Sequence, residues 1–570
     1  MQSLNKFANA FAKVVVLAAF WAGVAVAGSP TGGGAINSTS NPGVIQGAVK
    51  GSDGKPVSGA YIKLTDGDGL TMLVISGGQG KFSANNLKPG KYTVQAVGGE
   101  MQSKTAAVDV SASKPEATDL SLSEHRAPEL APGWPGTPGT VGGGEVWNKN
   151  PRPQLPDGAG KEIAQQKCGQ CHAYSWFLSF RATSRDEWAG LIDSMRSNIA
   201  AWGGKADDLS PEEVNTLTDY FWTKLRKPAV DPNSRLPRRL DTGGVRYISV
   251  DYKIPRVEPE PHEITVGSDG FGYAAEHNGG RIAKLDPSTN TFSEIPPPPG
   301  ISPRVRFVTI GKGKGDNLWL ADAGANHRWL EYNVVTGAFR SFDIPQNLRG
   351  APAVSNTILE HPNGTVWLSS VFSNGMIGLD PKTGKWVLYA SPAGKKSGKS
   401  VGPYGFSIDH KGNIWFGEYA NNAIGRLDPQ TGEIDDFPVP IANAVPRKVT
   451  TDAQGNIWLA LHETGQIVKI DPNHIEMGHP EQMKIFAPPE GHTGTYSLSA
   501  DLKNGYIWAS FQSMDKIARF DPKTNIWVEF SVPYPESDIR RVEVDQKNPN
   551  RVWWTGDLSG HFGYIEVLDR

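Results

Sequence analysis

The stretch IWFGEYANNAIGRLDPQTG, Ile414–Gly432, decides the fold because variants of it recur through the C-terminal part of the chain. Each copy has an aromatic residue in a short apolar run, a polar turn, and a second run that ends near the pattern D-P-x-T-G. In that pattern the Asp side chain bonds the backbone, Pro presets φ and Gly accepts a positive φ, so it predicts a tight turn. The marker aromatic residues lie 43 to 50 residues apart and are Tyr273, Trp319, Trp367, Trp415, Trp458, Trp508 and Trp553.

A repeat of about 40 to 50 residues with several short strands is typical of a β-propeller blade. The seven markers predict a seven-bladed β-propeller over residues 240–570. The last copy ends after its third strand, whereas the segment Tyr247–Pro255 has the pattern of a fourth strand. We therefore expect this segment to pair with the end of the chain and close the ring, which would remove an exposed sheet edge.

These repeats resemble the virginiamycin B lyase (streptogramin lyase) family over the whole propeller. The resemblance implies an enzyme that opens a cyclic depsipeptide ester by elimination, with a histidine base and a bound magnesium ion. A divalent cation, Mg²⁺ or Ca²⁺, is accordingly expected in the propeller. The resemblance assigns neither the base nor the metal ligands to particular residues of this chain.

One face of the propeller should gather polar residues from two positions in each repeat. These positions are the turn after the second strand and the first residues of the inner strand, where His262, Tyr496 and Arg540 also lie. Acids and bases in such a ring suit proton abstraction or metal binding, although loops at a propeller mouth are polar simply because they are solvated. The candidate catalytic residues are Glu276, His277, Arg306, Tyr404, Glu418, Arg447 and His462.

The chain has only two cysteines, Cys168 and Cys171, in the segment QQKCGQCHAYSW. A C-x-x-C pair alone could form a small disulfide, a thioredoxin-like redox pair or half of a zinc site. The histidine that follows, His172, completes the C-x-x-C-H pattern of c-type haem attachment. We therefore predict one covalent haem c, held by Cys168 and Cys171, with His172 as an iron ligand.

Two helices should follow this motif. Ser184-x-x-Glu187 is a capping box, and the apolar residues after it fall on one helical face that includes Met195. A second helix should begin at Ser210. Together with the C-x-x-C-H motif, residues 158–228 resemble the mono-haem cytochrome c domains of quinohaemoprotein and sulfite dehydrogenases. The resemblance implies that Met195 is the second iron ligand and that the domain carries one electron.

The N-terminal part contains three further segments. Residues 1–27 have a charged start, an apolar run and a final Ala-Val-Ala, which predict a cleaved secretory signal. Residues 44–124 resemble the carboxypeptidase regulatory-like (transthyretin-like) β-sandwich, a non-catalytic module. Residues 125–157 are rich in Pro and Gly and predict a linker. The fold class expected is mainly β, with a sandwich, a small α-helical cytochrome c domain and a propeller.

The resulting hypothesis is a periplasmic (or secreted) c-type cytochrome whose propeller docks a redox partner or binds a small substrate to be oxidised. The partner would be a small cytochrome, a copper protein or a dehydrogenase. The alternatives are a lyase of the streptogramin lyase type and a non-catalytic binding scaffold. A net charge of −2 and a pI near 6.7 argue against nucleic acid, and no membrane span is expected after signal cleavage.

Overall fold

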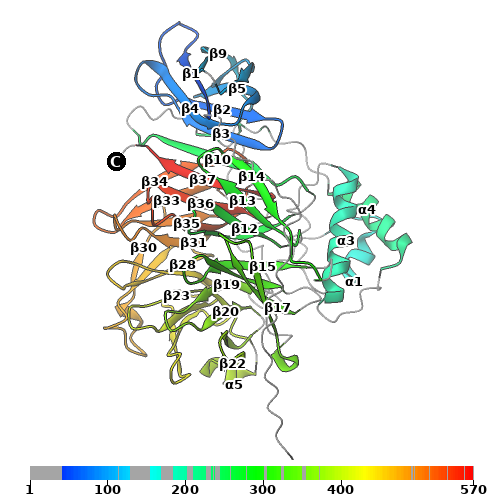
Figure 1. The fold of residues 1–570 in the computed structure, drawn as a ribbon, viewed down its shortest axis with the longest axis vertical. Coiled ribbons are helices and arrows are strands. Elements are labelled where there is room, and N and C mark those ends of the chain that lie inside the picture. The colour runs from blue at the N-terminus through cyan, green and yellow to red at the C-terminus, as the bar shows by residue number, and fades with distance from the viewer. Residues whose placement is uncertain are drawn as a thin grey trace, which may run out of the picture. The chain divides into compact units, whose positions relative to one another are not determined.

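The structure is a computed structural model, and the residues that it describes are 42–112, 114–128, 155–167, 184–201, 209–225, 231, 233–234, 236–237, 244–256, 259–277, 279–300, 305–322, 327–348, 355–371, 373–398, 400–489, 492, 494–512, 514–535, 537–557 and 559–568. Within these residues the chain is mainly β, with four α-helices (Figure 1). Strands 4–9 residues long with Gly-containing turns between them dominate the chain, as the repeats predicted.

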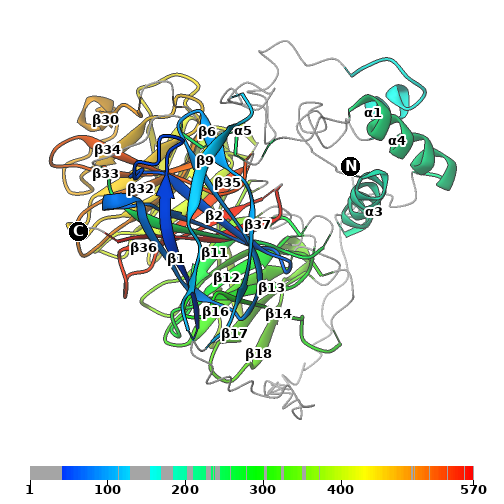
Figure 2. The same ribbon diagram turned by 90° about the horizontal axis from the view of Figure 1, so that it is seen from above.

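Six antiparallel four-stranded sheets form most of the propeller, and Figure 2 shows their strands from a second direction. In each sheet the strands pair in chain order, so the first strand is the innermost of the blade and the fourth the outermost. The strands are β11 (Pro261–Val266), β12 (Gly272–Glu276), β13 (Ile282–Asp286), β14 (Thr291–Ile295); β15 (Phe307–Lys312), β16 (Asn317–Asp322), β17 (Arg328–Asn333), β18 (Phe339–Asp343); β19 (Ser355–Glu360), β20 (Val366–Ser370), β21 (Gly375–Asp380), β22 (Lys385–Ala390); β23 (Pro403–Ile408), β24 (Ile414–Glu418), β25 (Ala423–Leu427), β26 (Ile434–Pro438); β27 (Pro446–Thr451), β28 (Ile457–Leu461), β29 (Ile467–Ile470), β30 (Lys484–Phe486); and β31 (Thr495–Ala500), β32 (Ile507–Phe511), β33 (Lys516–Asp521), β34 (Ile526–Ser531).

The last three strands and an upstream strand belong to a larger sheet, so the separate four-stranded sheets number six rather than seven. The strands are β35 (Ile539–Val544), β36 (Arg551–Gly556), β37 (His561–Val567) and β10 (Tyr247–Lys253), paired in that order. The expected pairing of Tyr247–Lys253 with the end of the chain is confirmed, with Val250 opposite Tyr564. Side-chain hydrogen bonds join these strands to both β31 and β11, through Ser497 to Val542 and through Thr555 to His262.

The N-terminal strands form a sandwich-like sheet that continues from β10. Strand β3 pairs antiparallel with β10, and Val74 lies opposite Ile248. Alternate side chains of these strands are buried around Ile62, Leu64 and Val94, as period-two patterning requires. The strands are β1 (Gly43–Lys50), β2 (Tyr61–Asp66), β3 (Leu70–Ile75), β4 (Lys81–Leu87), β5 (Gly90–Gly98), β6 (Met101–Ser103), β7 (Ala106–Val110), β8 (Glu116–Ala117) and β9 (Leu120–His125).

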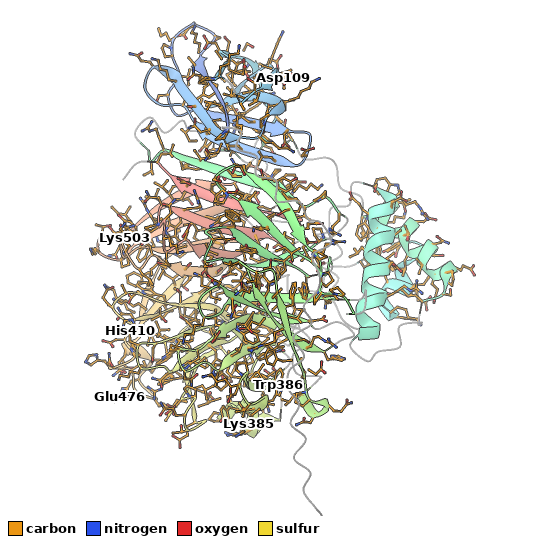
Figure 3. The ribbon with its side chains drawn as sticks, viewed as in Figure 1. Asp109, Lys385, Trp386, His410, Glu476 and Lys503 are labelled. Carbon is orange, nitrogen blue, oxygen red and sulfur yellow. The ribbon has the colours of Figure 1, made fainter. Side chains whose placement is uncertain are left out.

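The marker aromatic residues are buried between blades, as the repeats predicted. Trp458 on β28 packs with residues of the next sheet and lies 6.1 Å from the ring of Phe520. Outer strands carry a second aromatic layer, in which Trp386, labelled in Figure 3, packs edge-on against Trp329 at 4.7 Å. The turns have the predicted form: the Asp428 carboxylate accepts from the amide of Gln430, and Gly432 has φ 78°.

Three helices lie in the region where a cytochrome c domain was expected, and a fourth, α5 (Pro392–Ser397), follows β22. They are α1 (Lys161–Gln166), α3 (Arg185–Ala201) and α4 (Pro211–Lys224). The capping box of α4 is present, and the ring of Trp188 on α3 lies 4.9 Å from that of Phe221 on α4. The haem attachment residues Cys168, Cys171 and His172, and the side chain of Met195, lie outside the described residues. Among the helices that the structure describes, none is long and apolar enough to cross a membrane.

Candidate functional site

The mouth of the propeller is built from one loop geometry that recurs five times. The residue just before an inner strand has a positive φ, and its carbonyl accepts a hydrogen bond from the residue that follows the second strand. Glu260 has φ 43°, and its carbonyl accepts from the amide of His277 at 3.0 Å. A non-glycine residue in this conformation costs free energy, which is typical of functional sites. The acceptor and donor pairs are Glu260 and His277, Gly402 and Tyr419, Val445 and His462, Gly494 and Gln512, and Asp538 and Asp557.

The residue two positions after each positive-φ residue lies on an inner strand and has a buried polar side chain. These five side chains contact one another, and they are His262, Tyr404, Arg447, Tyr496 and Arg540. Nη1 of Arg447 donates to the hydroxyl of Tyr404 at 2.8 Å, and that hydroxyl bonds the hydroxyl of Tyr496. Nε2 of His262 lies 3.1 Å from the Tyr496 hydroxyl. The guanidinium of Arg540 lies 5.3 Å from the Tyr496 ring centre. Five strands of different blades thus bring one imidazole, two phenols and two guanidinium groups together.

The buried ion pair of Glu263 and Lys448 orients the imidazole of His262 through its Nδ1. Nδ1 of His262 lies 3.0 Å from the carboxylate of Glu263, and Nζ of Lys448 lies 2.5 Å from the same oxygen. Burial is the largest influence on the pKa of Glu263 and raises it, but the charges of Lys448 and Arg541 and the hydrogen bond with His262 together lower it. Burial also lowers the pKa of Lys448 to about 8. Because an ionised Glu263 accepts hydrogen bonds only, Nδ1 of His262 carries a proton, and in the neutral imidazole Nε2 then accepts from Tyr496.

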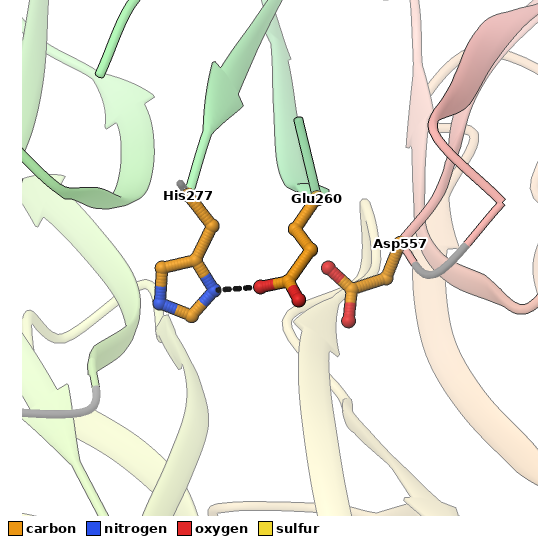
Figure 4. Close-up of side chains that lie close together, drawn as sticks. All are labelled: Glu260, His277 and Asp557. Carbon is orange, nitrogen blue, oxygen red and sulfur yellow. Dashed lines mark ion pairs between the residues drawn. The ribbon is translucent and has the colours of Figure 1, made fainter. Parts of the chain in front are cut away.

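Beside this set lies an acidic group, in which the side chains of Glu260, His277 and Asp557 point toward one another (Figure 4). Their nitrogen and oxygen atoms lie within 4.8 Å of one another, and Nδ1 of His277 lies 3.5 Å from Oε2 of Glu260. Nε2 of His277 is buried and has no hydrogen-bond partner among the described residues. The His262 and His277 ring centres are 6.2 Å apart, so the two sets form one site.

The charges around this group shift its proton affinities. Burial and the neighbouring Asp557 raise the pKa of Glu260 to about 8, against the opposing charges of Arg306 and Arg540. Burial and the charge of Arg306 lower the pKa of His277 well below its usual range. His277 is therefore neutral near pH 7 and keeps a lone pair, as a general base or a metal ligand must.

Carboxylates and an amide complete the wall of the site. Nη2 of Arg540 lies 3.0 Å from Asp538 and 3.4 Å from Asp557. The amide of Gln512 donates to Asp538 at 2.6 Å, and its oxygen lies 2.7 Å from Nε2 of His462. Burial lowers the pKa of His462, which keeps that imidazole neutral. The guanidinium of Arg540 thus already has two carboxylate partners.

The structure joins five of the sequence candidates in this site, namely His277, Arg306, Tyr404, Arg447 and His462. The two remaining candidates contact other groups. Glu276 is fully buried against Arg256, 2.8 Å away, and the amide of Asn421 donates to Glu418. Burial raises the pKa of Glu276 to about 7 and that of Glu418 to about 8. Glu276 and Glu418 are the last residues of β12 and β24, the second strands of their blades. The residues at the mouth are those that follow the second strands.

Sequence reasoning did not identify Glu260, Asp538, Asp557 and Gln512 as site residues. Asp557 and Gln512 occupy the position of His277 and His462, four residues after the marker aromatic, so the repeat contained a usable signal for these two. Glu260 and Asp538 precede inner strands, where other repeats have Gly402 and Gly494. An acidic residue where the repeat favours glycine is the signal that could have found them.

Comparisons with known proteins agree with two of the three resemblances. A model of the virginiamycin B lyase family matches residues 306–569, and a model of the carboxypeptidase regulatory-like domain matches residues 44–123. Neither match covers residues 158–228, and a cytochrome c domain is not shown. No curated protein matches the chain.

Several solved structures are similar to part of the chain. Virginiamycin B lyase from Staphylococcus aureus is 18% identical, with a TM-score of 0.47, over 56% of this chain and 98% of its own. A streptogramin B lyase is 20% identical, with a TM-score of 0.47, over 56% of this chain and 96% of its own. Hydrazine synthase from Kuenenia stuttgartiensis is 12% identical, with a TM-score of 0.42, over 56% of this chain and 98% of its own. The chain therefore combines a carboxypeptidase regulatory-like domain with a virginiamycin B lyase-like β-propeller.

Proposed function

We propose that the propeller mouth is the active site of a lyase that cleaves a small cyclic or ester-linked compound by elimination. The observation that carries the proposal is the geometry of His277, whose Nδ1 faces Glu260 while its buried Nε2 has no hydrogen-bond partner in the described part of the chain. A neutral imidazole with a carboxylate beside one nitrogen and an unengaged lone pair on the other is suited to general-base catalysis. The family match over residues 306–569 supports the same class of reaction.

In this mechanism ionised Glu260 accepts a hydrogen bond from Nδ1–H of His277 and so leaves the lone pair on Nε2. Nε2 takes a proton from the carbon next to the carbonyl group of the substrate. The electron pair of that C–H bond forms a C=C bond, the adjacent C–O bond breaks, and the oxygen leaves as a carboxylate. The imidazolium that forms is stabilised by Glu260, and no water enters the product.

A divalent cation is the other candidate for the group formed by Glu260, His277 and Asp557. Two carboxylates and an imidazole within 4.8 Å are a donor set that such an ion could use. The guanidinium of Arg540, however, lies 3.4 Å from Asp557, and the charge of Arg306 also acts on Glu260. Two buried cations oppose the entry of a third. We therefore assign no catalytic step to a metal, and activity after dialysis against a chelator tests this choice.

We also propose that β35, β36, β37 and β10 act as a seventh blade that closes the ring. Their pairing order and their side-chain hydrogen bonds to β31 and β11 support this arrangement. Closure is functionally important because it brings Glu260, near the start of the propeller, next to Asp557, near its end. The apolar run within residues 1–27 supports export of the chain to the periplasm or medium.

Electron transfer through haem c is a second candidate function, favoured by the motif Cys168-Gly-Gln-Cys171-His172. The apolar faces of α3 and α4 pack together as a small haem domain would need. Expression with haem-attachment machinery should add the mass of one haem, and Cys168→Ser with Cys171→Ser should abolish the addition. If wild-type protein exported under these conditions carries no haem, the electron-transfer candidate fails.

An elimination assay tests the main proposal. Purified protein is incubated in H₂¹⁸O with a panel of cyclic and linear esters, and the products are analysed by mass spectrometry. The panel includes quinupristin, the compound present in a solved structure of an inactive variant of virginiamycin B lyase from Staphylococcus aureus. Elimination from a cyclic ester gives one product of unchanged elemental composition with a new C=C bond, and elimination from a linear ester gives an alkene and a carboxylic acid. Hydrolysis instead adds ¹⁸O. His277→Asn should abolish turnover and His474→Asn, at an 81% exposed side chain, should not. Turnover by hydrolysis, or full activity of His277→Asn, would refute the proposal.

A further inference from the structure

We infer that Arg447, Tyr404 and Tyr496 form a subsite for a carboxylate group, which we call the carboxylate subsite. Its role as the receiver of the leaving group rests on the proposed function, but binding of a carboxylate there does not. The three residues come from β27, β23 and β31, and their exposed fractions are 2%, 7% and 0%. All three side chains are therefore buried, and none belongs to the solvated loops of the propeller.

The guanidinium of Arg447 is held by aromatic groups. Its central carbon lies 4.7 Å from the ring centre of Tyr404 and 4.5 Å from that of Tyr496, and Nη1 donates to the Tyr404 hydroxyl. The two rings are inclined at 75° to each other, so together with the hydrogen bond they restrict where the guanidinium can lie. A planar guanidinium matches the two oxygens of a carboxylate. This is the arrangement that distinguishes a carboxylate from a neutral amide.

The direction of the hydrogen bonds also favours an anion. The proton on Nδ1 of His262 belongs to the bond with Glu263, so Tyr496 donates to Nε2 of His262. Tyr496 must then accept from Tyr404, and Tyr404 accepts from Arg447. The hydrogen bonds thus run from Arg447 to Tyr404, from Tyr404 to Tyr496, and from Tyr496 to His262. Both phenol protons are therefore engaged within the cluster, and its remaining polar groups are the cationic guanidinium groups.

The positive charge of Arg540 close to Arg447 makes the binding of an anion at Arg447 more favourable. The guanidinium of Arg540 lies 5.3 Å from the same Tyr496 ring as that of Arg447. Two cations packed on one buried ring repel each other, and the repulsion is strong where water is excluded. The carboxylates that contact Arg540 are Asp538 and Asp557, and the charge of Glu463 also acts on Arg447. A ligand carboxylate at Arg447 would reduce this repulsion and gain a charge-assisted hydrogen bond.

The position suits the proposed elimination. The C–H proton passes to His277, and the C–O bond that breaks releases a carboxylate that bears the full negative charge. The cluster links the two ends of this reaction, because His262 lies against His277 on one side and hydrogen-bonds Tyr496 on the other. Charge that develops on the leaving oxygen would be stabilised by groups already in place, without reorganisation.

Calorimetry with benzoate and its neutral counterpart benzamide tests the subsite on the full-length protein. We expect benzoate to bind and benzamide to bind about tenfold more weakly or not at all. Arg447→Gln should weaken benzoate binding about tenfold or more, and Arg447→Lys, which keeps the charge but loses the planar group, should give an intermediate loss. Arg519→Gln is the matched control, because the Arg519 guanidinium also lies over an aromatic ring, that of Tyr506 at 4.5 Å, but Arg519 is on β33, the third strand of its blade.

The outcomes separate the subsite from the proposed function. Benzoate binding that depends on Arg447 and survives His277→Asn supports the subsite even if no elimination is ever detected. Equal affinity for benzoate and benzamide, or unchanged benzoate binding in Arg447→Gln, overturns the inference. Thermal unfolding of each variant shows whether it is folded, and if Arg447→Gln is unfolded, Arg447→Lys and Tyr404→Phe decide the result. Equal benzoate affinity in these two variants and the wild type also overturns the inference.

Discussion

Nδ1 of His277 lies 3.5 Å from Oε2 of Glu260, and the amide of His277 donates to the carbonyl of the same glutamate. The two residues are therefore held together by both backbone and side chain. Because Glu260 lies beside Nδ1 of His277, Nε2 is the nitrogen assigned as the general base. Several expected outcomes depend on this pair and on the closure of the ring around it.

Loss of the base should be more damaging than loss of its orienting partner. We expect His277→Asn to reduce kcat for elimination by about a hundredfold or more, the usual contribution of general-base catalysis. Glu260→Gln keeps a hydrogen-bond acceptor beside Nδ1 but removes the charge, so its loss should be smaller and confined to kcat. Steady-state kinetics measure both. Equal losses in the two variants, or losses in KM alone, would contradict the assigned roles.

The rate should rise with pH through the ionisation of Glu260. The mechanism needs ionised Glu260, and burial raises the pKa of this group to about 8, so kcat/KM should increase between pH 7 and 9. The pKa of His277 is lowered well below its usual range, so its protonation should not limit the rate near neutral pH. Glu260→Gln should flatten the profile. A wild-type profile that already levels off at pH 6.5 would contradict the role of a Glu260 whose pKa is raised to about 8.

The buried pair Lys448–Glu263 should matter for stability chiefly when it is broken. Lys448→Met leaves Glu263 buried with less compensation, so the free energy of unfolding should fall by about 3–5 kcal/mol. The double variant Lys448→Met with Glu263→Leu should be more stable than Lys448→Met alone, because no uncompensated charge remains. Denaturant unfolding followed by tryptophan fluorescence measures each variant.

A surface pair supplies the control for that experiment. Lys88 and Asp68 lie 2.7 Å apart with side chains 53% and 64% exposed. Lys88→Met should therefore change the free energy of unfolding by less than about 1 kcal/mol. If Lys448→Met is no more destabilising than Lys88→Met, the inner ion pair does not support the mouth as we describe.

Ring closure should depend on the backbone of β10. Val250 is fully buried and lies between Met72 on one side and Tyr564 on the other, so its N–H faces a paired strand in either direction. Val250→Pro should lower the free energy of unfolding by about 3 kcal/mol or more, since it removes a ladder hydrogen bond. Val250→Ala keeps the N–H and should cost less. Equal thermal midpoints for the two variants would argue against a structural role for this pairing.

Much of the fold followed from local patterns in the sequence. The D-P-x-T-G turns, the marker aromatics and the period-two strands each depend on interactions within a few residues. The local sequence of each copy therefore predicts its turns and strands, as the turn at Asp428 and Gly432 shows. The pairing of Tyr247–Lys253 with the end of the chain also followed, because an incomplete last copy requires a strand from elsewhere. The apolar faces of α3 and α4 were predictable for the same local reason.

The composition of the site was decided only by tertiary structure. Side chains of a strand alternate in direction, so a shift of one residue separates the buried Glu276 from His277 in the mouth. Glu260 meets Asp557 only because the two ends of the propeller lie side by side, a contact that no local pattern encodes. Sequence periodicity thus determined the blades, whereas closure of the ring determined which charges share a buried space, and their pKa values follow from that burial.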